Sequence, residues 1–359
     1  MGGQTAILRR PDEQLAGIGH KTQRLQHSIM KQIEYARFGK PTDVLRLTEA
    51  TPGAPESGQV VVEVEAAPIH PIDLLTIRGK YGQLPELPAV PGIEGVGRVR
   101  EVGQGVTQVG PGDLVLLPFN SGSWRQQVCV PAEGLFALPD RADPHQLATV
   151  SVNGLLAELL LSEIVKLRPG DWIVQNAANS SVGQYLITLA KRRGVKTANI
   201  VLALGGVDRK LRELGADAII VDRGQDVRED VAAAVGFNAP KLGIDAVGGG
   251  ATDVLASCLE PGGTVVNYGT LSGEDCRLSS DQAIYKDIRL RGFWLQRWLD
   301  EHPGEAAAHH RELAELVSDG KLVGEIEGTY PLKRFKEAVR QASRRHGAGK
   351  IILTPDSRW

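Results

Sequence analysis

The chain has 359 residues, with 41 Lys and Arg against 43 Asp and Glu, and only three cysteines. This near-neutral charge gives no electrostatic basis for binding nucleic acid or an anionic membrane surface. Three cysteines cannot form a disulfide framework, and no window approaches the run of about 20 apolar residues that a membrane-spanning helix needs. These features predict a soluble protein of two domains in a reducing compartment.

The first 29 residues differ from the rest of the chain, because they are polar and contain no aromatic residue. They lack the apolar middle section of a secretory signal peptide. Four basic residues leave a mitochondrial transit peptide as an alternative, although two acidic residues lie among them. We predict an extension over residues 1–29 and a cytoplasmic protein, or a mitochondrial one if the extension is a transit peptide.

Residues 30–152 have the pattern of short strands separated by turns. Val60 to Ile69 and Gly95 to Gly103 alternate between apolar and polar residues, as half-buried strands do. A Gly-Pro-Gly-Asp turn at 110–113 then leads into another apolar run. This part of the sequence predicts a small, barrel-like β domain.

The pattern then changes to apolar strands that alternate with amphipathic helices. A helix is expected over 148–167, and strands are expected at 172–178, 197–203, 217–222, 242–249, 263–269 and 287–295. Repeated strand–helix–strand units of this kind predict a doubly wound parallel sheet. Two helices near 305–319 and 332–345 and a strand at 350–354 follow. We therefore divide the chain into a β-rich domain of residues 30–152 and 297–359, and a Rossmann domain of residues 153–296.

The turn from Gln175 to Gln184 lies where a dinucleotide-binding fingerprint would be. The free N–H groups and the dipole of a helix start can bind a pyrophosphate, and small residues let the backbone come close to it. Only Gly183 of the G-x-G-x-x-G pattern is a glycine, so a simple helix cap at Asn179 or Ser180 is the alternative. The predicted pyrophosphate site consists of Asn179, Ser180, Ser181, Val182 and Gly183.

The stretch after the next strand, Val201 to Lys210, does not identify the cofactor. Neither an acidic residue for a ribose 2′-hydroxyl nor an arginine for a 2′-phosphate follows the strand directly. The residue types alone therefore leave NADPH and NADH open.

The order of these parts resembles the medium-chain dehydrogenase/reductase superfamily over about residues 30–359. Within it, the chain is most similar to the mitochondrial-type trans-2-enoyl-thioester reductases. Three segments carry this similarity: Arg78–Gly97, Val174–Gln184 and Lys286–Trp298. The resemblance implies an α/β fold with a GroES-like catalytic domain and a Rossmann cofactor domain. It also implies NADPH, an enoyl-CoA or acyl-carrier-protein substrate, and a homodimer.

The zinc-dependent alcohol dehydrogenases of the superfamily are excluded by their ligand residues. This chain has no cysteine in Ile69 to Asp73, and Ile93 occupies the position of the histidine ligand. His70, Asp73 and Glu94 alone do not form the nitrogen and sulfur set that zinc prefers. We predict no metal site, with His70 as a packed or hydrogen-bonded residue.

Reducing a C=C bond conjugated to a thioester carbonyl requires a hydride at Cβ and a proton at Cα. The nicotinamide supplies the hydride. The resemblance implies that Tyr81, in the Gly-Lys-Tyr-Gly segment at 79–82, donates the proton and that Asn153 lies beside it near the nicotinamide. A phenol with a pKa of about 10 stays protonated at neutral pH. The alternative for Tyr81 is an ordinary tyrosine at the surface or covering the core.

The resemblance also implies further cofactor residues. Tyr268 and Gly269 follow a parallel strand, at the edge where cofactors bind in such sheets. Phe293, Trp294 and Leu295 match a segment that lines the cofactor and the acyl pocket, and Lys350 matches a lysine that contacts phosphate. For Phe293 the alternative is the interdomain core, and for Lys350 a solvated lysine.

Two departures from the family pattern concern the cofactor. Ser181 occupies the position of a family glycine, and the family arginine that favours NADPH is absent. The predicted function is NAD(P)H-dependent reduction of the C=C bond of a trans-2-enoyl thioester. The alternatives are a zinc-free quinone or alkenal oxidoreductase of the same superfamily and a nucleotide-binding protein without catalysis.

Overall fold

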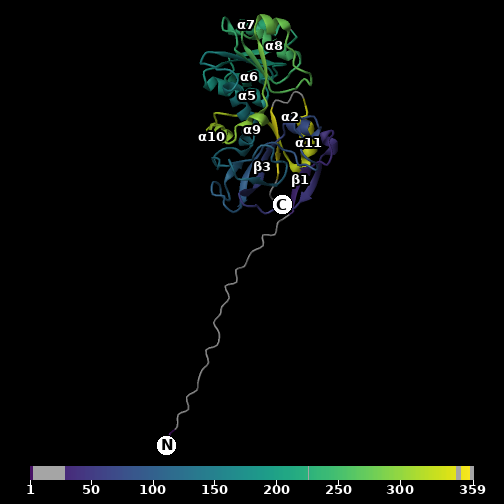
Figure 1. The fold of residues 1–359 in the computed structure, drawn as a ribbon, viewed down its shortest axis with the longest axis vertical. Helices are drawn as coiled ribbons and strands as arrows, with labels where there is room; N and C mark the ends of the chain where they lie inside the picture. The colour runs from purple at the N-terminus through teal and green to yellow at the C-terminus, as the bar shows by residue number, and fades with distance from the viewer. Residues whose placement is uncertain (3–28, 225, 345–348, 356–359) are drawn as a thin grey trace.

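The computed structural model describes residues 1–2, 29–224, 226–344 and 349–355, so the predicted extension lies almost wholly outside the described residues. The chain forms two lobes along the long axis (Figure 1). The lower lobe holds strands β1 and β3 together with helices α2 and α11, and the upper lobe holds helices α5 to α8. Helices α9 and α10 lie where the two lobes meet.

The lower lobe is built mainly from antiparallel strands, and its one parallel pair among the described residues is β13 with β14. One pair is formed by β1 (Met30–Glu34) and β2 (Arg46–Ala50). A second sheet has the order β13-β14-β3-β4-β5, with β6 also paired to β3. The bounds are β3 (Gln59–Pro68), β4 (Val96–Val102), β5 (Leu114–Leu116), β6 (Gln127–Pro131), β13 (Ile326–Pro331) and β14 (Lys350–Thr354). Short helices α1 (Pro41–Val44), α2 (Pro71–Ile77) and α11 (Phe335–Ala342) complete this lobe.

The last strand returns to the first lobe and pairs with its central strand. Ile352 of β14 lies opposite Pro68 of β3, and the two strands are antiparallel. The alternating residues Val60, Val62 and Val64 of β3 are buried, which is the period-2 pattern expected of a strand over a core. This return confirms the predicted final strand.

The upper lobe contains one parallel sheet in the order β12-β11-β10-β7-β8-β9. Its strands are β7 (Trp172–Gln175), β8 (Lys196–Val201), β9 (Ala218–Val221), β10 (Leu242–Asp245), β11 (Thr264–Asn267) and β12 (Arg289–Gly292). Its helices are α5 (Ser181–Arg192), α6 (Val207–Leu214), α7 (Val227–Val235) and α8 (Gly250–Cys258). The strand order reverses between β7 and β10, as in a Rossmann sheet. The predicted α/β fold with a doubly wound sheet is therefore confirmed.

The helix expected over 148–167 is interrupted. The structure has α3 (Pro144–Leu147), a π-helix η1 (Val150–Gly154) and α4 (Leu155–Ser162) in this region. The N–H of Val152 donates to the Glu94 carboxylate at 2.8 Å instead of along the helix, and this turn is widened. Beyond β12 the chain forms α9 (Leu295–Glu301) and α10 (Glu305–Ser318). A second π-helix, η2 (Asp281–Tyr285), precedes β12, and a 3₁₀ helix, η3 (Leu332–Arg334), precedes α11.

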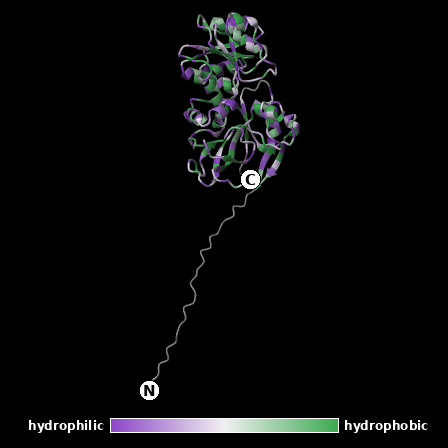
Figure 2. Cartoon of the chain, in the orientation of Figure 1, coloured by the Kyte–Doolittle hydropathy of each residue, from purple (hydrophilic) through white to green (hydrophobic). Residues whose placement is uncertain are grey.

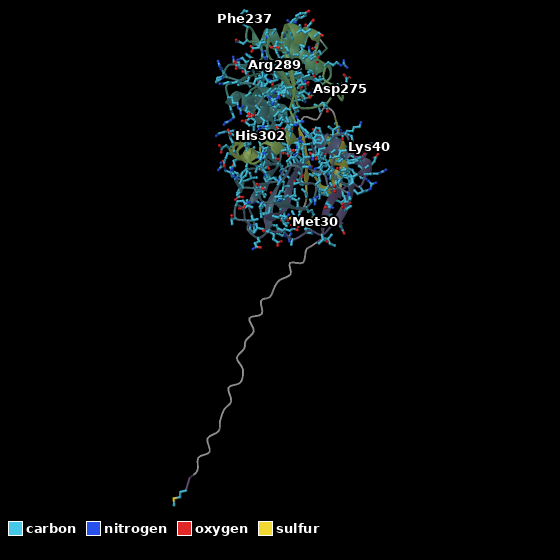
Figure 3. The ribbon with its side chains drawn as sticks, in the orientation of Figure 1. Met30, Lys40, Phe237, Asp275, Arg289 and His302 are labelled. Carbon is cyan, nitrogen blue, oxygen red and sulfur yellow. The ribbon has the colours of Figure 1, made fainter. Side chains whose placement is uncertain are left out.

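Apolar residues concentrate in the sheets and polar residues on the outer helices, as Figure 2 shows by hydropathy. Within the described residues, no helix combines the length and the apolar character needed to cross a membrane. The side chains drawn in Figure 3 extend from Met30 at the lower end to Phe237 at the upper end.

Candidate active site

A pocket lies between the loop that follows α2 and the start of α9. Nine of its ten lining residues belong to the lower lobe, and the tenth, Gln296, lies on α9, where the two lobes meet. The ten residues are Ile72, Thr76, Tyr81, Gln83, Leu84, Pro85, Ile93, Phe119, Asn120 and Gln296. Their mixed apolar and amide character suits a ligand with an apolar chain and a few polar atoms.

Tyr81, on this pocket, is held by Trp294 from a segment 213 residues later in the chain. The indole Nε1 of Trp294 donates a hydrogen bond to the Tyr81 hydroxyl oxygen at 2.7 Å. The two rings meet edge to face, with centroids 6.2 Å apart. Because the oxygen accepts this bond, the O–H of Tyr81 remains free to donate to a ligand.

The pKa of Tyr81 favours the protonated phenol. Partial burial raises it, and the hydrogen bond from Trp294 opposes that effect without cancelling it. The hydroxyl therefore carries its proton at neutral pH, which a proton donor requires. Sequence and structure agree that Tyr81 is a ring on a loop. It is not an ordinary surface tyrosine, because it is partly buried and lines a pocket.

Asn153 lies on the π-helix η1 and is 4% exposed. Its Nδ2 has no hydrogen-bond partner among the described residues. An unpaired buried N–H costs roughly 1–3 kcal/mol, so the group is ready to bind a ligand that brings an acceptor.

The predicted pyrophosphate turn lies at the start of α5. Ser180 is the N-cap, and its hydroxyl accepts from the N–H of Gly183 at 3.2 Å. A Cβ added to Gly183 would lie 2.6 Å from the carbonyl oxygen of Ala178, so only glycine allows this approach. The simple helix cap, which was the alternative to a pyrophosphate site, is therefore present at Ser180. The same turn also has the close strand–helix packing that is typical of a nucleotide site.

A second pair of residues, missed by the sequence reasoning, joins the strands where their order reverses. The amide of Asn176, directly after β7, donates from Nδ2 to Asp245 at the end of β10, at 2.7 Å. In return, the N–H of Ala246 donates to Oδ1 of Asn176 at 2.8 Å. An aspartate at the end of an apolar strand, followed by glycines, was the available signal. The pair fixes the crevice in which dinucleotides bind.

Tyr268 and Gly269 lie at this same edge of the sheet. The hydroxyl of the half-buried Tyr268 is hydrogen-bonded to the side chain of Ser180, and burial raises the pKa of Tyr268. A Cβ at Gly269 would lie 2.6 Å from the carbonyl oxygen of Ala246. The structure thus brings the two halves of the predicted cofactor site together.

Three predicted cofactor residues remain, Phe293, Leu295 and Lys350, and they differ in burial and in contacts. Phe293 is half-buried and packs against the core that the two lobes share, and Leu295 is buried in that core at the start of α9. Lys350 is 8% exposed, so it is not the solvated lysine of the alternative. Its Nζ lies 3.3 Å from Nδ1 of His70, and its contact with a phosphate stays a prediction.

Family models match both lobes. Residues 56–140 match the alcohol dehydrogenase GroES-like domain, and residues 214–353 match a domain described as zinc-binding dehydrogenase. In the described part of the chain, however, no three His, Cys, Asp or Glu side chains form a group that could hold a metal ion.

Individual proteins resemble the chain over most of its length. The mitochondrial enoyl-acyl-carrier-protein reductase of Rattus norvegicus is 35% identical over 333 residues, covering 91% of this chain and 89% of the relative. A Bacillus thuringiensis structure provisionally called an NADPH:quinone reductase is 28% identical, with a TM-score of 0.84, over 92% of this chain and 100% of that one. A complex of Etr1p with NADP and crotonyl-CoA has the same fold, with a TM-score of 0.84 and 24% identity, over 91% and 100%.

Proposed function

We propose that this chain, which belongs to the mitochondrial enoyl-acyl-carrier-protein reductase family of the medium-chain dehydrogenase/reductase superfamily, reduces trans-2-enoyl thioesters with NADPH. The observation that carries the proposal is Tyr81, which lines the pocket and accepts a hydrogen bond from Trp294. The pair holds a protonated phenol, with its O–H free, on the pocket that we assign to the enoyl group.

Tyr81 is the proposed proton donor. Bound NADPH supplies the hydride that the Cβ atom of the enoyl thioester receives. The O–H of Tyr81 then gives its proton to Cα, and the hydrogen bond from Trp294 stabilises the phenolate oxygen as charge develops on it. Asn153 offers its unpaired Nδ2 to an oxygen acceptor of the ligands.

The cofactor is seated along the edge formed by the carboxyl ends of the parallel strands. The start of α5 takes the pyrophosphate, because Gly183 lets the helix pack closely on the backbone of Ala178 and the first N–H groups of a helix have no partner within it. No carboxylate directly follows β8, so nothing there repels a 2′-phosphate. The Etr1p complex shows that this architecture accommodates NADP together with crotonyl-CoA.

The test is turnover of crotonyl-CoA with each cofactor, followed by the loss of absorbance of the reduced nicotinamide. We expect NADPH oxidation with saturation in both substrates, and a larger kcat/KM with NADPH than with NADH. The Bacillus thuringiensis relative motivates a quinone as the competing substrate. Rapid quinone reduction without enoyl turnover would replace the proposal, and nucleotide binding without either activity would indicate a protein without catalysis.

The exposed edge of the parallel sheet supports a homodimer. All four residues of β12 are exposed, and Arg289, labelled in Figure 3, is the first of them. Leu290 on β12 and Ile284 and Tyr285 just before it expose apolar side chains at 40%, 70% and 80%. Native proteins usually cover such an edge, and a second copy related by a twofold axis can do so by pairing β12 with β12.

The dimer is tested by light scattering after size-exclusion chromatography. We expect a dimer for the unchanged chain and a shift to monomer for Leu290→Lys, with Arg209→Lys on α6, beside β9 at the opposite edge of the sheet, as the control. A monomer at micromolar concentration for the unchanged chain would overturn this assignment.

The names of the relatives support a location in the cell. The relatives are named mitochondrial enzymes, whereas the sequence alone predicts a cytoplasmic protein unless residues 1–29 are a transit peptide. We propose the mitochondrial location. Import of the full chain into isolated mitochondria, with and without residues 1–29, distinguishes the two locations.

A further inference from the structure

Among the buried ionisable side chains near the candidate active site, His70, Glu94 and Lys350 interact with one another and take no part in the proton transfer proposed above. His70, Glu94 and Lys350 are 3%, 0% and 8% exposed. They come from distant stretches of the chain: the loop after β3, the segment before β4 and the first residue of β14. Burying such groups is costly unless they are paired, so their arrangement needs a physical explanation.

The His70 ring connects the other two side chains. Its Nε2 is hydrogen-bonded to Oε1 of Glu94, and its Nδ1 lies 3.3 Å from Nζ of Lys350. An ammonium can only donate, so Nδ1 accepts and the ring proton is on Nε2. Burial lowers the pKa of His70, in agreement with a neutral ring. The imidazole therefore bridges a carboxylate and an ammonium.

The second oxygen of the Glu94 carboxylate holds the π-helix η1. Oε2 accepts from Oγ of Ser151 at 2.7 Å and from the N–H of Val152 at 2.8 Å. The next residue is Asn153, whose Nδ2 has no partner in the described part of the chain. Glu94 thus fixes the backbone turn that carries this amide.

His70 also begins the helix that leads to the proposed proton donor. It is the N-cap of α2, and its backbone N–H donates to Oδ2 of Asp73 at 2.8 Å. The other oxygen of Asp73 accepts from the N–H of Ile93 at 3.1 Å, directly before Glu94. The start of α2 and the Glu94 segment are therefore tied together.

We propose that His70, Glu94 and Lys350 form a positioning network that holds Asn153 and Tyr81 at the spacing needed for proton transfer. The proposal rests on the proposed function, because it assigns the network a role in that reaction. It gives Lys350 a role different from the phosphate contact implied by the family resemblance. None of the three residues needs to touch the substrate.

The first experiment separates positioning from cofactor binding at Lys350. Lys350→Met is compared with Lys350→Arg and with the control variant Lys241→Met. Lys241 forms an ion pair with Asp171, which lies just before β7. This pair is at the opposite ends of the parallel strands from the cofactor site. We expect Lys350→Met to lower kcat at least tenfold with a Kd for NADPH within twofold of the unchanged chain, and Lys350→Arg to recover part of the loss. A tenfold weaker Kd with unchanged kcat would overturn the proposal in favour of phosphate binding.

The second experiment asks whether Glu94 acts through Asn153. Glu94→Gln, Asn153→Ala and the double variant form a cycle, and interacting residues give non-additive effects. We expect Glu94→Gln to lower kcat at least tenfold in the otherwise unchanged chain. In the Asn153→Ala background, the same change should lower kcat less than twofold. Equal costs in both backgrounds would overturn the proposal. If Glu94→Gln does not fold, Ser151→Ala replaces it, because this change removes one outer hydrogen bond and leaves the carboxylate buried and paired.

A structural measurement keeps this inference separate from the proposed function. Hydrogen–deuterium exchange over residues 150–154 should be faster in Ser151→Ala than in Lys241→Met, whatever reaction the protein catalyses. Unchanged exchange would overturn the network itself. If the unchanged chain reduces no enoyl thioester, the proposed function fails, whereas activity with an additive cycle overturns only the inference.

Discussion

Replacing Tyr81 by phenylalanine tests the proposed proton transfer most directly, because the change removes one hydroxyl and keeps the ring. The hydroxyl oxygen accepts a hydrogen bond of 2.7 Å from Trp294, whose ring is 38% exposed, so water can take its place. The folded state should therefore lose no more than about 1 kcal/mol. Loss of a general acid costs a factor of about 10² to 10⁴, which raises the barrier by about 3–5 kcal/mol.

The assay is single-turnover oxidation of NADPH by crotonyl-CoA in a stopped-flow instrument, with NADPH binding measured separately by fluorescence. We expect a slower reduction step, at least tenfold and nearer a hundredfold, and an unchanged Kd for NADPH. Trp294→Phe serves as the matched variant, because it keeps the ring contact but removes the donor to Tyr81. Its loss should be smaller than that of Tyr81→Phe. Reduction by Tyr81→Phe at more than half the original rate would refute the assignment of the proton donor.

Three further predictions concern the cofactor turn and stability. Gly183→Ala should weaken NADPH binding at least tenfold, because its Cβ would lie 2.6 Å from backbone, whereas Gly250→Ala, which meets nothing within 4 Å, should bind normally in the same titration. Ala177 has a φ of 48°, in the left-handed region that is strained for alanine. Ala177→Gly should therefore raise the free energy of unfolding by up to about 1 kcal/mol in denaturant titrations. A loss of stability would contradict this strain. Burial lowers the pKa of Lys350 to about 8 in the folded state. Between about pH 8 and 10.4, Lys350 is therefore mainly neutral in the folded state and mainly protonated in the unfolded state. Stability should rise with pH across that window by no more than about 3 kcal/mol, and Lys350→Met, compared by thermal unfolding, should lack this rise.

The parallel sheet could be predicted from the sequence because its signal is local. Apolar strands alternate with amphipathic helices, and each β-α-β unit leaves few topologies to choose from. The π-helix could not be predicted this way. Its apolar period matches a regular helix, and the irregularity comes from Glu94, about 60 residues earlier in the sequence, which captures the N–H of Val152.

The site shows the same division between local and distant signals. The family resemblance identifies Tyr81 and Trp294 one by one. Their hydrogen bond joins positions 213 residues apart, and no local sequence pattern predicts it. Lys350 precedes an ordinary final strand, so its burial against His70 follows only from the pairing of β14 with β3. The pair of Asn176 and Asp245 was missed because a single polar residue at a strand end is common, and its meaning depends on which strands are neighbours.

The pairing of the last strand with β3 has a consequence for how the protein is made. All strands of the parallel sheet lie between Trp172 and Gly292, so that sheet can form while the ribosome still holds the remaining chain. The lower lobe must wait, because Pro68 of β3 pairs with Ile352, which is made after the whole parallel sheet. Lys350 arrives with the same strand. A chain terminated before β14 would therefore contain the whole parallel sheet but lack a finished catalytic lobe, so that activity requires the synthesis of this strand.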